Sequence, residues 1–114
     1  MTSDEIKSVV LETLDNLKAR DIQVLDVRGL TGMTDFMIIA TGTSSRHVKA
    51  LAEEVEQTLK QRGQPALGVE GADTAEWVLV DFADVLVHVM QAEARAFYEL
   101  EKLWSAPAAP GDAH

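Results

Sequence analysis

Two aspartates and a histidine near residue 80 are the side chains best suited to chemistry. Asp81, Asp84 and His88 are of the types that bind metal ions or transfer protons, and they lie close together in the chain. A structural metal site usually has four ligands, and an acid–base pair needs a pocket around it. The segment offers neither a fourth ligand nor a glycine-rich pocket. We therefore predict no metal site and no catalytic centre here.

A second candidate is the turn Gly42-Thr43-Ser44-Ser45, which leads from a predicted strand into a predicted helix. Free N–H groups at a helix start can bind phosphate. The turn lacks the lysine of a P-loop and the three-glycine spacing of a dinucleotide site. Ser44 or Ser45 as an ordinary helix N-cap is the favoured interpretation. Next to it, His47 is expected to be solvated, and Arg46 is a surface cation that could contact an anion.

The stretch that surrounds the aspartates, from Trp77 to Met90, predicts a β-hairpin, because it is rich in β-branched and aromatic residues and is broken at Ala83-Asp84. With those two residues as the loop, alternation divides the side chains between two faces. One face is wholly apolar and should lie on the core: Val78, Val80, Phe82, Val85, Val87 and Val89. The other face is mixed and suits a partner surface: Trp77, Leu79, Asp81, Leu86, His88 and Met90.

This division depends on the length of the loop. A two-residue loop requires positive φ, which costs Ala83 about 1 kcal/mol relative to glycine. A four-residue loop from Phe82 to Val85 would keep the same pairs, whereas a three- or five-residue loop would move Trp77 to the valine side. A C-terminal helix could also cover the mixed face. From the pattern alone, partner binding and simple burial of that face both remain open.

The remaining apolar periodicity predicts an α/β domain with a mixed β-sheet and flanking helices. Thr2 and Glu5 form a capping-box pattern before the first helix. The first two helices should cover one face of the sheet. The expected elements are a helix over roughly 4–20, strands over 22–27 and 33–41 (the second buried on both sides), a helix that opens at the turn 42–45 and ends before Gly63, a strand over 66–70, the hairpin, and a helix over 92–104 with Phe97, Leu100 and Trp104 on one face. We expect one domain over residues 1–104 and a disordered tail over 105–114.

Composition narrows the class of partner. The 114 residues hold 19 acids against 10 lysines and arginines, for a net charge of −9. Binding to a nucleic-acid backbone depends on neutralising phosphates, so little direct nucleic-acid contact is expected. Two explanations of the acidity stay open at this point: it aids solubility, or it attracts a basic protein partner. The chain has no cysteine, no apolar run long enough for a membrane span and no signal-peptide pattern at its start. We expect a cytoplasmic protein with no membrane association.

Several separated motifs resemble the ribosomal silencing factor family (RsfS, also called the Iojap-like proteins). The hairpin from Trp77 to His88 carries the strongest likeness. Other matching segments occur in the family's order: Thr34-Asp35-Phe36, Thr41-Gly42-Thr43-Ser44-Ser45-Arg46, Glu70-Gly71, and Arg95 with Phe97, Tyr98, Leu100, Glu101, Leu103 and Trp104. The likeness covers residues 4–104. The chain departs from it at Ala83, where many relatives have glycine.

The resemblance implies a nucleotidyltransferase-like fold without transferase activity and without a cofactor. Members of the family bind the universal ribosomal protein fourteen of the large ribosomal subunit, block joining of the small subunit and lower translation when nutrients are scarce. Free members can be homodimers. The family's contact surface corresponds here to the mixed hairpin face, with Tyr98 added from the helix that follows. An enzyme that uses Gly42-Thr43-Ser44 is the alternative, but transferases of that kind hold metal with an Asp-x-Asp pair, which this sequence lacks.

Overall fold

Helices and strands alternate along the chain, and the computed structural model describes them for residues 1–104. The predicted order of elements is confirmed up to the last helix. The predicted tail over 105–114 lies outside the described residues. The bounds are α1 Ser3–Asn16, β1 Arg20–Asp26, β2 Phe36–Gly42, α2 Ser45–Gln61, β3 Gly68–Glu70, β4 Trp77–Asp81, β5 Val85–Gln91, α3 Ala92–Tyr98 and α4 Leu100–Trp104.

Five strands form one mixed sheet in the order β1-β2-β5-β4-β3. β2 and β5 run parallel, and the other neighbouring pairs are antiparallel. A parallel pair needs a long crossover between its strands, and the segment from α2 to β4 supplies it. Every residue of β2 is buried, which confirms the expected burial on both faces. The molecule is therefore a single α/β domain with helices on both sides of a mixed sheet.

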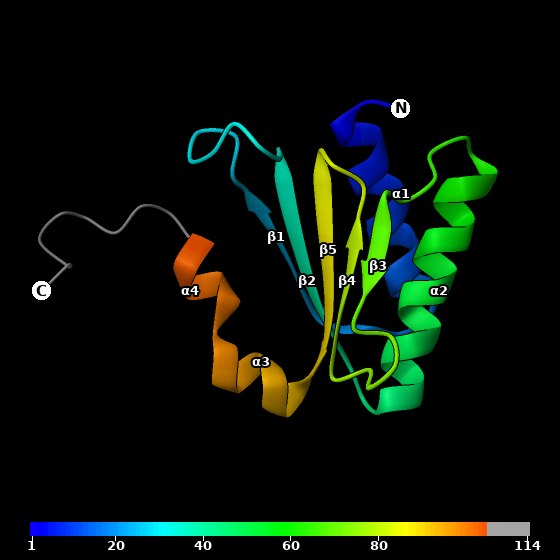
Figure 1. Ribbon diagram of the computed structural model, residues 1–114, viewed down its shortest axis with the longest axis vertical. Helices are drawn as coiled ribbons and strands as arrows, with labels where there is room; N and C mark the ends of the chain where they lie inside the picture. The colour runs from blue at the N-terminus through cyan, green and yellow to red at the C-terminus, as the bar shows by residue number, and fades with distance from the viewer. Residues whose placement is uncertain (105–114) are drawn as a thin grey trace, which may run out of the picture.

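α1 and α2 pack side by side on one face of this sheet, as predicted (Figure 1). The apolar hairpin face points toward them and is buried throughout. Full burial of one such side chain contributes about 1.5–3 kcal/mol. The main core consists of Ile6, Val10 and Leu14 from α1, Val48, Leu51, Val55 and Leu59 from α2, Phe36 and Ile38 from β2, and all six apolar hairpin residues.

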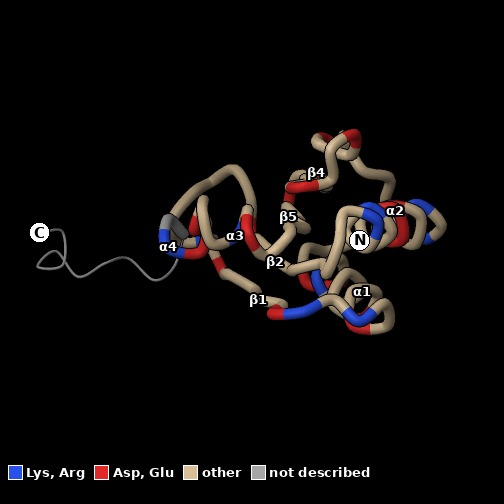
Figure 2. Tube along the Cα trace, turned by 90° about the horizontal axis from the view of Figure 1, so that it is seen from below, with Lys and Arg blue, Asp and Glu red and all other residues tan. Residues whose placement is uncertain are grey.

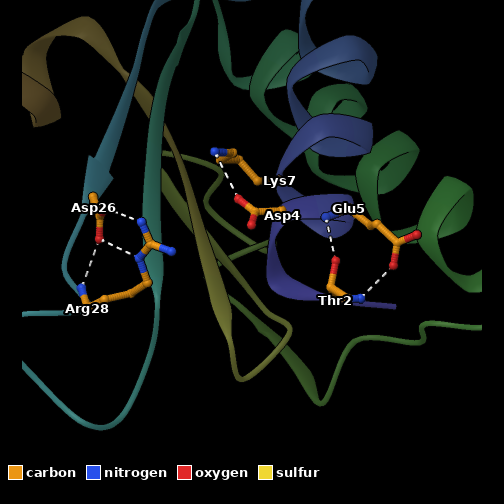
Figure 3. A network of polar contacts seen from close by, with 6 residues as sticks. All are labelled: Thr2, Asp4, Glu5, Lys7, Asp26 and Arg28. Atoms are coloured by element: carbon orange, nitrogen blue, oxygen red, sulfur yellow. Dashed lines mark hydrogen bonds and ion pairs between the residues drawn. The ribbon is translucent and has the colours of Figure 1, made fainter.

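α1 begins with the predicted capping box. The Glu5 backbone N–H donates to Thr2 Oγ1 at 3.1 Å, and the Thr2 N–H donates to Glu5 Oε1 at 2.8 Å (Figure 3). The helix ends at Asn16, four residues before the predicted end. The reason is that Lys18 adopts φ 63°, a left-handed conformation that stops a helix.

The start of the β1–β2 connection is fixed by an ion pair. The Arg28 guanidinium lies 2.6 Å from Asp26 Oδ2, and the Arg28 backbone N–H donates to Asp26 Oδ1 (Figure 3). These hydrogen bonds lower the pKa of Asp26 to about 2.

The hairpin adopts the predicted register. Val78 pairs with Val89, and Val80 pairs with Val87. Phe82 donates its N–H to the Val85 carbonyl at 3.0 Å. Ala83 has φ 67°, so the strain expected for this turn is present. The division of the hairpin into an apolar and a mixed face is confirmed.

The predicted helix over 92–104 is wrong in one respect, because it is two helices. Glu99 takes φ 50° and ends α3, and α4 begins at the next residue. The sequence around Glu99 contains no proline or glycine that would predict the break. Figures 1 and 2 show both helices on the sheet face opposite α1 and α2. Phe97 is 79% exposed whereas Leu100 is buried, so the prediction that they share one helix face is wrong, and the side chain of Trp104 lies outside the described residues.

Candidate protein-binding face

The sheet face that α1 and α2 leave uncovered, which we call the outer face, carries the mixed hairpin side chains. They divide into two groups by burial. Four are half-buried and reach the surface: Trp77, Leu79, Asp81 and Leu86. Met90 is 0% exposed and His88 only 7% exposed. The prediction that these last two lie on an exposed surface is wrong.

Met90 is buried because the C-terminal helices cover its end of the outer face. It belongs to a second apolar cluster on this side of the sheet, which is formed by Leu25, Val27, Met37, Ile39, Met90 and Leu100. Leu100, at the start of α4, belongs to this cluster from the helix side, and Ala94 of α3 packs against it. Met90 is thus a core residue of this side of the sheet and not a surface residue of the outer face.

Arg95 holds the two short helices against the sheet. Its Nε donates to Glu101 Oε2 at 2.9 Å, which bridges the break between α3 and α4. Its Nη1 donates to Thr41 Oγ1 at 2.9 Å, at the end of β2. Arg95, on α3, is thus bonded to α4 and to β2. These bonds hold both helices against the sheet despite the break between them.

An aromatic group lies where α3 meets the hairpin. The rings of Trp77 and Tyr98 are 4.7 Å apart between centroids, and the Tyr98 and Phe97 rings meet edge-on at 5.0 Å. Tyr98 is 50% exposed, in agreement with its predicted place on the surface. Exposed aromatic side chains of this kind are typical anchors of protein interfaces.

His88 lies directly behind this group. Trp77 Nε1–H donates to His88 Nδ1 at 2.8 Å, and the two ring centroids are 5.8 Å apart. Burial lowers the pKa of His88 to about 4, so the imidazole is neutral at pH 7. Since Nδ1 accepts a hydrogen bond, the ring proton is on Nε2. That nitrogen is buried and has no hydrogen-bond partner among the described residues.

Asp81 has a local role in the turn. Its Oδ1 accepts a hydrogen bond from the Ala83 N–H at 2.7 Å, which stabilises the strained loop. Asp81 is paired with Leu86, whereas His88 is paired with Leu79, so the two polar groups are not opposite each other. Asp84 lies exposed in the loop. Residues 1–104 contain no group of three acids or histidines placed to hold a metal ion.

Two exposed apolar residues at the turn end of the outer face escaped the sequence analysis. Met33 is 87% exposed and Leu67 is 74% exposed. They flank an apolar hollow of about 300 Å³, whose floor includes Met37 and Leu86. Both residues were predicted in strands, whereas both lie in loops beside glycine. An apolar residue next to glycine at a predicted strand end was the available signal.

Comparison with known proteins identifies the family. The family described as "Ribosomal silencing factor during starvation" matches residues 1–113. The chain belongs to the ribosomal silencing factor family. A curated relative from Haemophilus influenzae, named ribosomal silencing factor RsfS, is 50% identical over 96 residues, which cover 84% of this chain and 94% of that protein.

Two further relatives extend the comparison. A crystal structure of a protein from Chromobacterium violaceum superimposes with a TM-score of 0.90 at 44% identity, and the match covers 96% of this chain and 91% of that one. A mouse protein named "Mitochondrial assembly of ribosomal large subunit protein 1" is 38% identical over 100 residues, which cover 85% of this chain and 44% of the mouse protein.

In this silencing-factor domain, the Gly42-Thr43-Ser44 motif has a structural explanation. Ser44 caps α2 and accepts from the His47 N–H at 3.1 Å. A Cβ on Gly42 would lie 2.7 Å from Val48 Cγ2, so glycine permits close packing of β2 on α2. His47 was expected to be solvated, and this is wrong. Its ring is half-buried, accepts from the Thr43 N–H at 2.9 Å and donates through Nε2 to the carbonyl of Leu17 at 2.8 Å.

The hollow beside this motif does not form a phosphate cradle. It has a volume of about 380 Å³, and the residues that line it include the acids Asp21 and Glu93 as well as Arg20. Negative side chains in the lining oppose a bound phosphate. The arrangement gives no support to a nucleotide site.

The Glu70-Gly71 motif lies against the start of β4. Gly71 has φ 87°, and a Cβ at this position would overlap the carbonyl oxygen of Trp77. Only glycine lets the loop pass this close to the start of β4. The motif therefore sets the backbone position of Trp77.

Proposed function

We propose that this protein silences ribosomes by binding the large ribosomal subunit through its universal ribosomal protein fourteen. Bound there, it would cover the subunit-joining face, keep the small subunit away and lower translation when nutrients are limiting. The names of its relatives support the ribosomal role, and the name of the mouse relative points to the large subunit. The interaction would be steric and would require neither a cofactor nor a catalytic residue.

The observation that carries this proposal is the outer face. Trp77, Leu79, Leu86 and Tyr98 reach the surface on it without a helix above them that would bury them completely. Half-buried aromatic and aliphatic side chains on a rigid sheet provide the preorganised anchors on which protein interfaces depend.

The charge around the hairpin indicates a basic partner. Residues 63–94 contain no lysine or arginine. Figure 2 shows acidic segments on β4 and in the loop beside it. The acids of this stretch are Glu70, Asp73, Glu76, Asp81, Asp84 and Glu93. An apolar centre within an acidic surround is complementary to a basic protein, and it would be repelled by exposed phosphates of ribosomal RNA.

Within the predicted contact set, the structure supports different roles. We propose that Trp77, Leu79, Asp81, Leu86 and Tyr98 touch the partner directly. Met90 and His88 lie below the surface and would act through the residues above them. The free protein exposes the same apolar residues to other copies of itself, so we also propose a homodimer in the absence of ribosomes, which sedimentation of the protein alone would detect.

The test is a titration of subunit joining, followed by light scattering with purified ribosomal subunits. A steric blocker acts by mass action, so inhibition should need roughly one protein per large subunit and should reverse on dilution. A chelator should have no effect, and subunits that are already joined should resist. Inhibition at one protein per hundred ribosomes, or inhibition that persists after the protein is removed, would indicate an enzyme and contradict the proposal.

A nucleotidyltransferase-like ancestry would be compatible with this function. The resemblance implies such a fold, and the Gly42-Thr43-Ser44 turn before α2 is compatible with it. The sequence lacks the Asp-x-Asp pair with which transferases of that kind bind metal.

No helix within residues 1–104 is long and apolar enough to cross a bilayer.

A further inference from the structure

His88 is a polar ring at a position that favours an apolar one. It is 7% exposed, and its neighbours in β5, Val87 and Val89, are completely buried. Its cross-sheet partners are Leu79 on β4 and Ile39 on β2. A leucine or methionine of similar volume would fill this space without a polar atom. Packing therefore does not explain a histidine here.

Hydrogen bonding within the core does not explain it either. Nε2 carries the ring proton and has no partner among the described residues. A buried donor without an acceptor opposes folding. Within residues 1–104, the imidazole makes one hydrogen bond, at Nδ1, which accepts from Trp77 Nε1–H at 2.8 Å. The specific contribution of histidine at this position is therefore an acceptor for the Trp77 indole.

This bond holds the largest aromatic side chain of the outer face. The indole is held on its N–H edge by His88, and its ring packs against Tyr98 at 4.7 Å. Without an acceptor at position 88, the indole N–H would lose the hydrogen bond that it makes in this structure. The side chain would then sample other rotamers. Ordering it at the moment of binding would reduce the affinity.

We propose that His88 is a positioning residue that sets the binding-ready orientation of Trp77 and does not itself touch the partner. The proposal rests on the proposed function for the identity of the partner, but the orientation of Trp77 is a property of the free protein. The low pKa of His88 is consistent with this role, because protonation of Nδ1 would remove the acceptor.

The first test observes the indole in the free protein. The Nε1–H signal of Trp77 is followed by ¹H–¹⁵N NMR, and Trp104→Phe identifies it, since the chain has two tryptophans. His88→Leu should shift this signal upfield and speed its exchange with water, while the free energy of unfolding at pH 7 stays equal or rises. His88→Met, which is unbranched and adapts to its site, serves if the leucine variant folds poorly. An unchanged indole signal in a folded variant would overturn the proposal.

The second test measures affinity for purified large subunits in a double-mutant cycle. His88→Leu should weaken binding about fivefold, the order expected for one hydrogen bond. In a Trp77→Ala background the same substitution should change affinity by less than about twofold, because its effect passes through the indole. An equal loss in both backgrounds would show direct contact and overturn the positioning role. If the wild type does not bind large subunits at all, the proposed function fails, and the NMR result still decides whether His88 orients Trp77.

Discussion

The substitution Trp77→Ala tests most directly whether the outer face binds the partner. The indole is half-buried, packs on Tyr98 and His88, and is the largest side chain that reaches the surface of this face. Truncation of a tryptophan anchor often weakens an interface by about 2 kcal/mol or more. We expect affinity for large subunits to fall at least about tenfold, or ~1.4 kcal/mol.

The same substitution should leave the fold intact. Loss of a fully buried tryptophan costs about 3–5 kcal/mol, and Trp77 is only partly buried, so about half of that range applies. The lost bond to His88 adds about 1 kcal/mol. Small domains have about 5–15 kcal/mol of stability, so the variant should remain folded. Circular dichroism and urea titration measure this directly.

The matched control is Leu11→Ala. Leu11 is also half-buried, but it lies on α1 and packs against the main core on the far side of the sheet. It should lower stability by a similar amount and leave binding unchanged. Val80→Asp, on the apolar hairpin face, should instead prevent folding, because it buries a lone carboxylate. If Trp77→Ala binds like the wild type, or if Leu11→Ala loses binding equally, the assignment of the outer face is wrong.

Three further predictions follow from single residues. Asp81→Lys should bind large subunits more weakly than Asp81→Asn, because the lysine adds repulsion from a basic partner while the asparagine keeps the acceptor for the Ala83 N–H. Affinities measured over a salt series test this. Equal affinities of the two variants would indicate that shape, and not charge, determines the contribution of this position. Ala83→Gly should raise the free energy of unfolding by up to about 1 kcal/mol, since φ is 67° there, and should not alter binding; a lower melting temperature would contradict the strain argument. The pKa of His88 is lowered to about 4, so the unfolded chain takes up this proton first as pH falls below 6.5, and stability drops between pH 6.5 and 4. His88→Leu should remove about 2 kcal/mol of the decrease seen in urea titrations between pH 7 and pH 5, and an unchanged slope would show that His88 does not titrate as described.

The hairpin was predictable because its signals are local and redundant. Six apolar residues with a period of two fix the face that meets the core, and a one-residue slip would expose all of them. The capping box at Thr2 and Glu5 is equally local, and it formed as predicted. The sequence was therefore enough to predict the strands along the chain, the register of the hairpin and the sheet face that the first two helices cover.

The break between α3 and α4 was not predictable from local signals. Glu99 is a good helix former, and it adopts a left-handed conformation because Arg95 and Leu100 tie the two helices to separate points of the sheet. Tertiary contacts override propensity here. The same helices decide that Met90 is covered and Tyr98 exposed. Hence the alternation of side chains predicted which hairpin residues lie on the outer face, but it did not predict which of them are exposed and which are buried.

Asp81 and His88, the polar residues first considered for catalysis or metal binding, each hold a neighbouring group of the outer face in place. Asp81 bonds the backbone of a strained loop, and His88 bonds the indole above it. Both bonds restrict the conformations of the free protein and so reduce what must be ordered on binding. A catalytic acid and base would instead have to face a common pocket, whereas these two side chains are paired with different residues and serve different neighbours. Asp81 and His88 are therefore better explained as structural supports of the outer face than as the acid and base of one catalytic pocket.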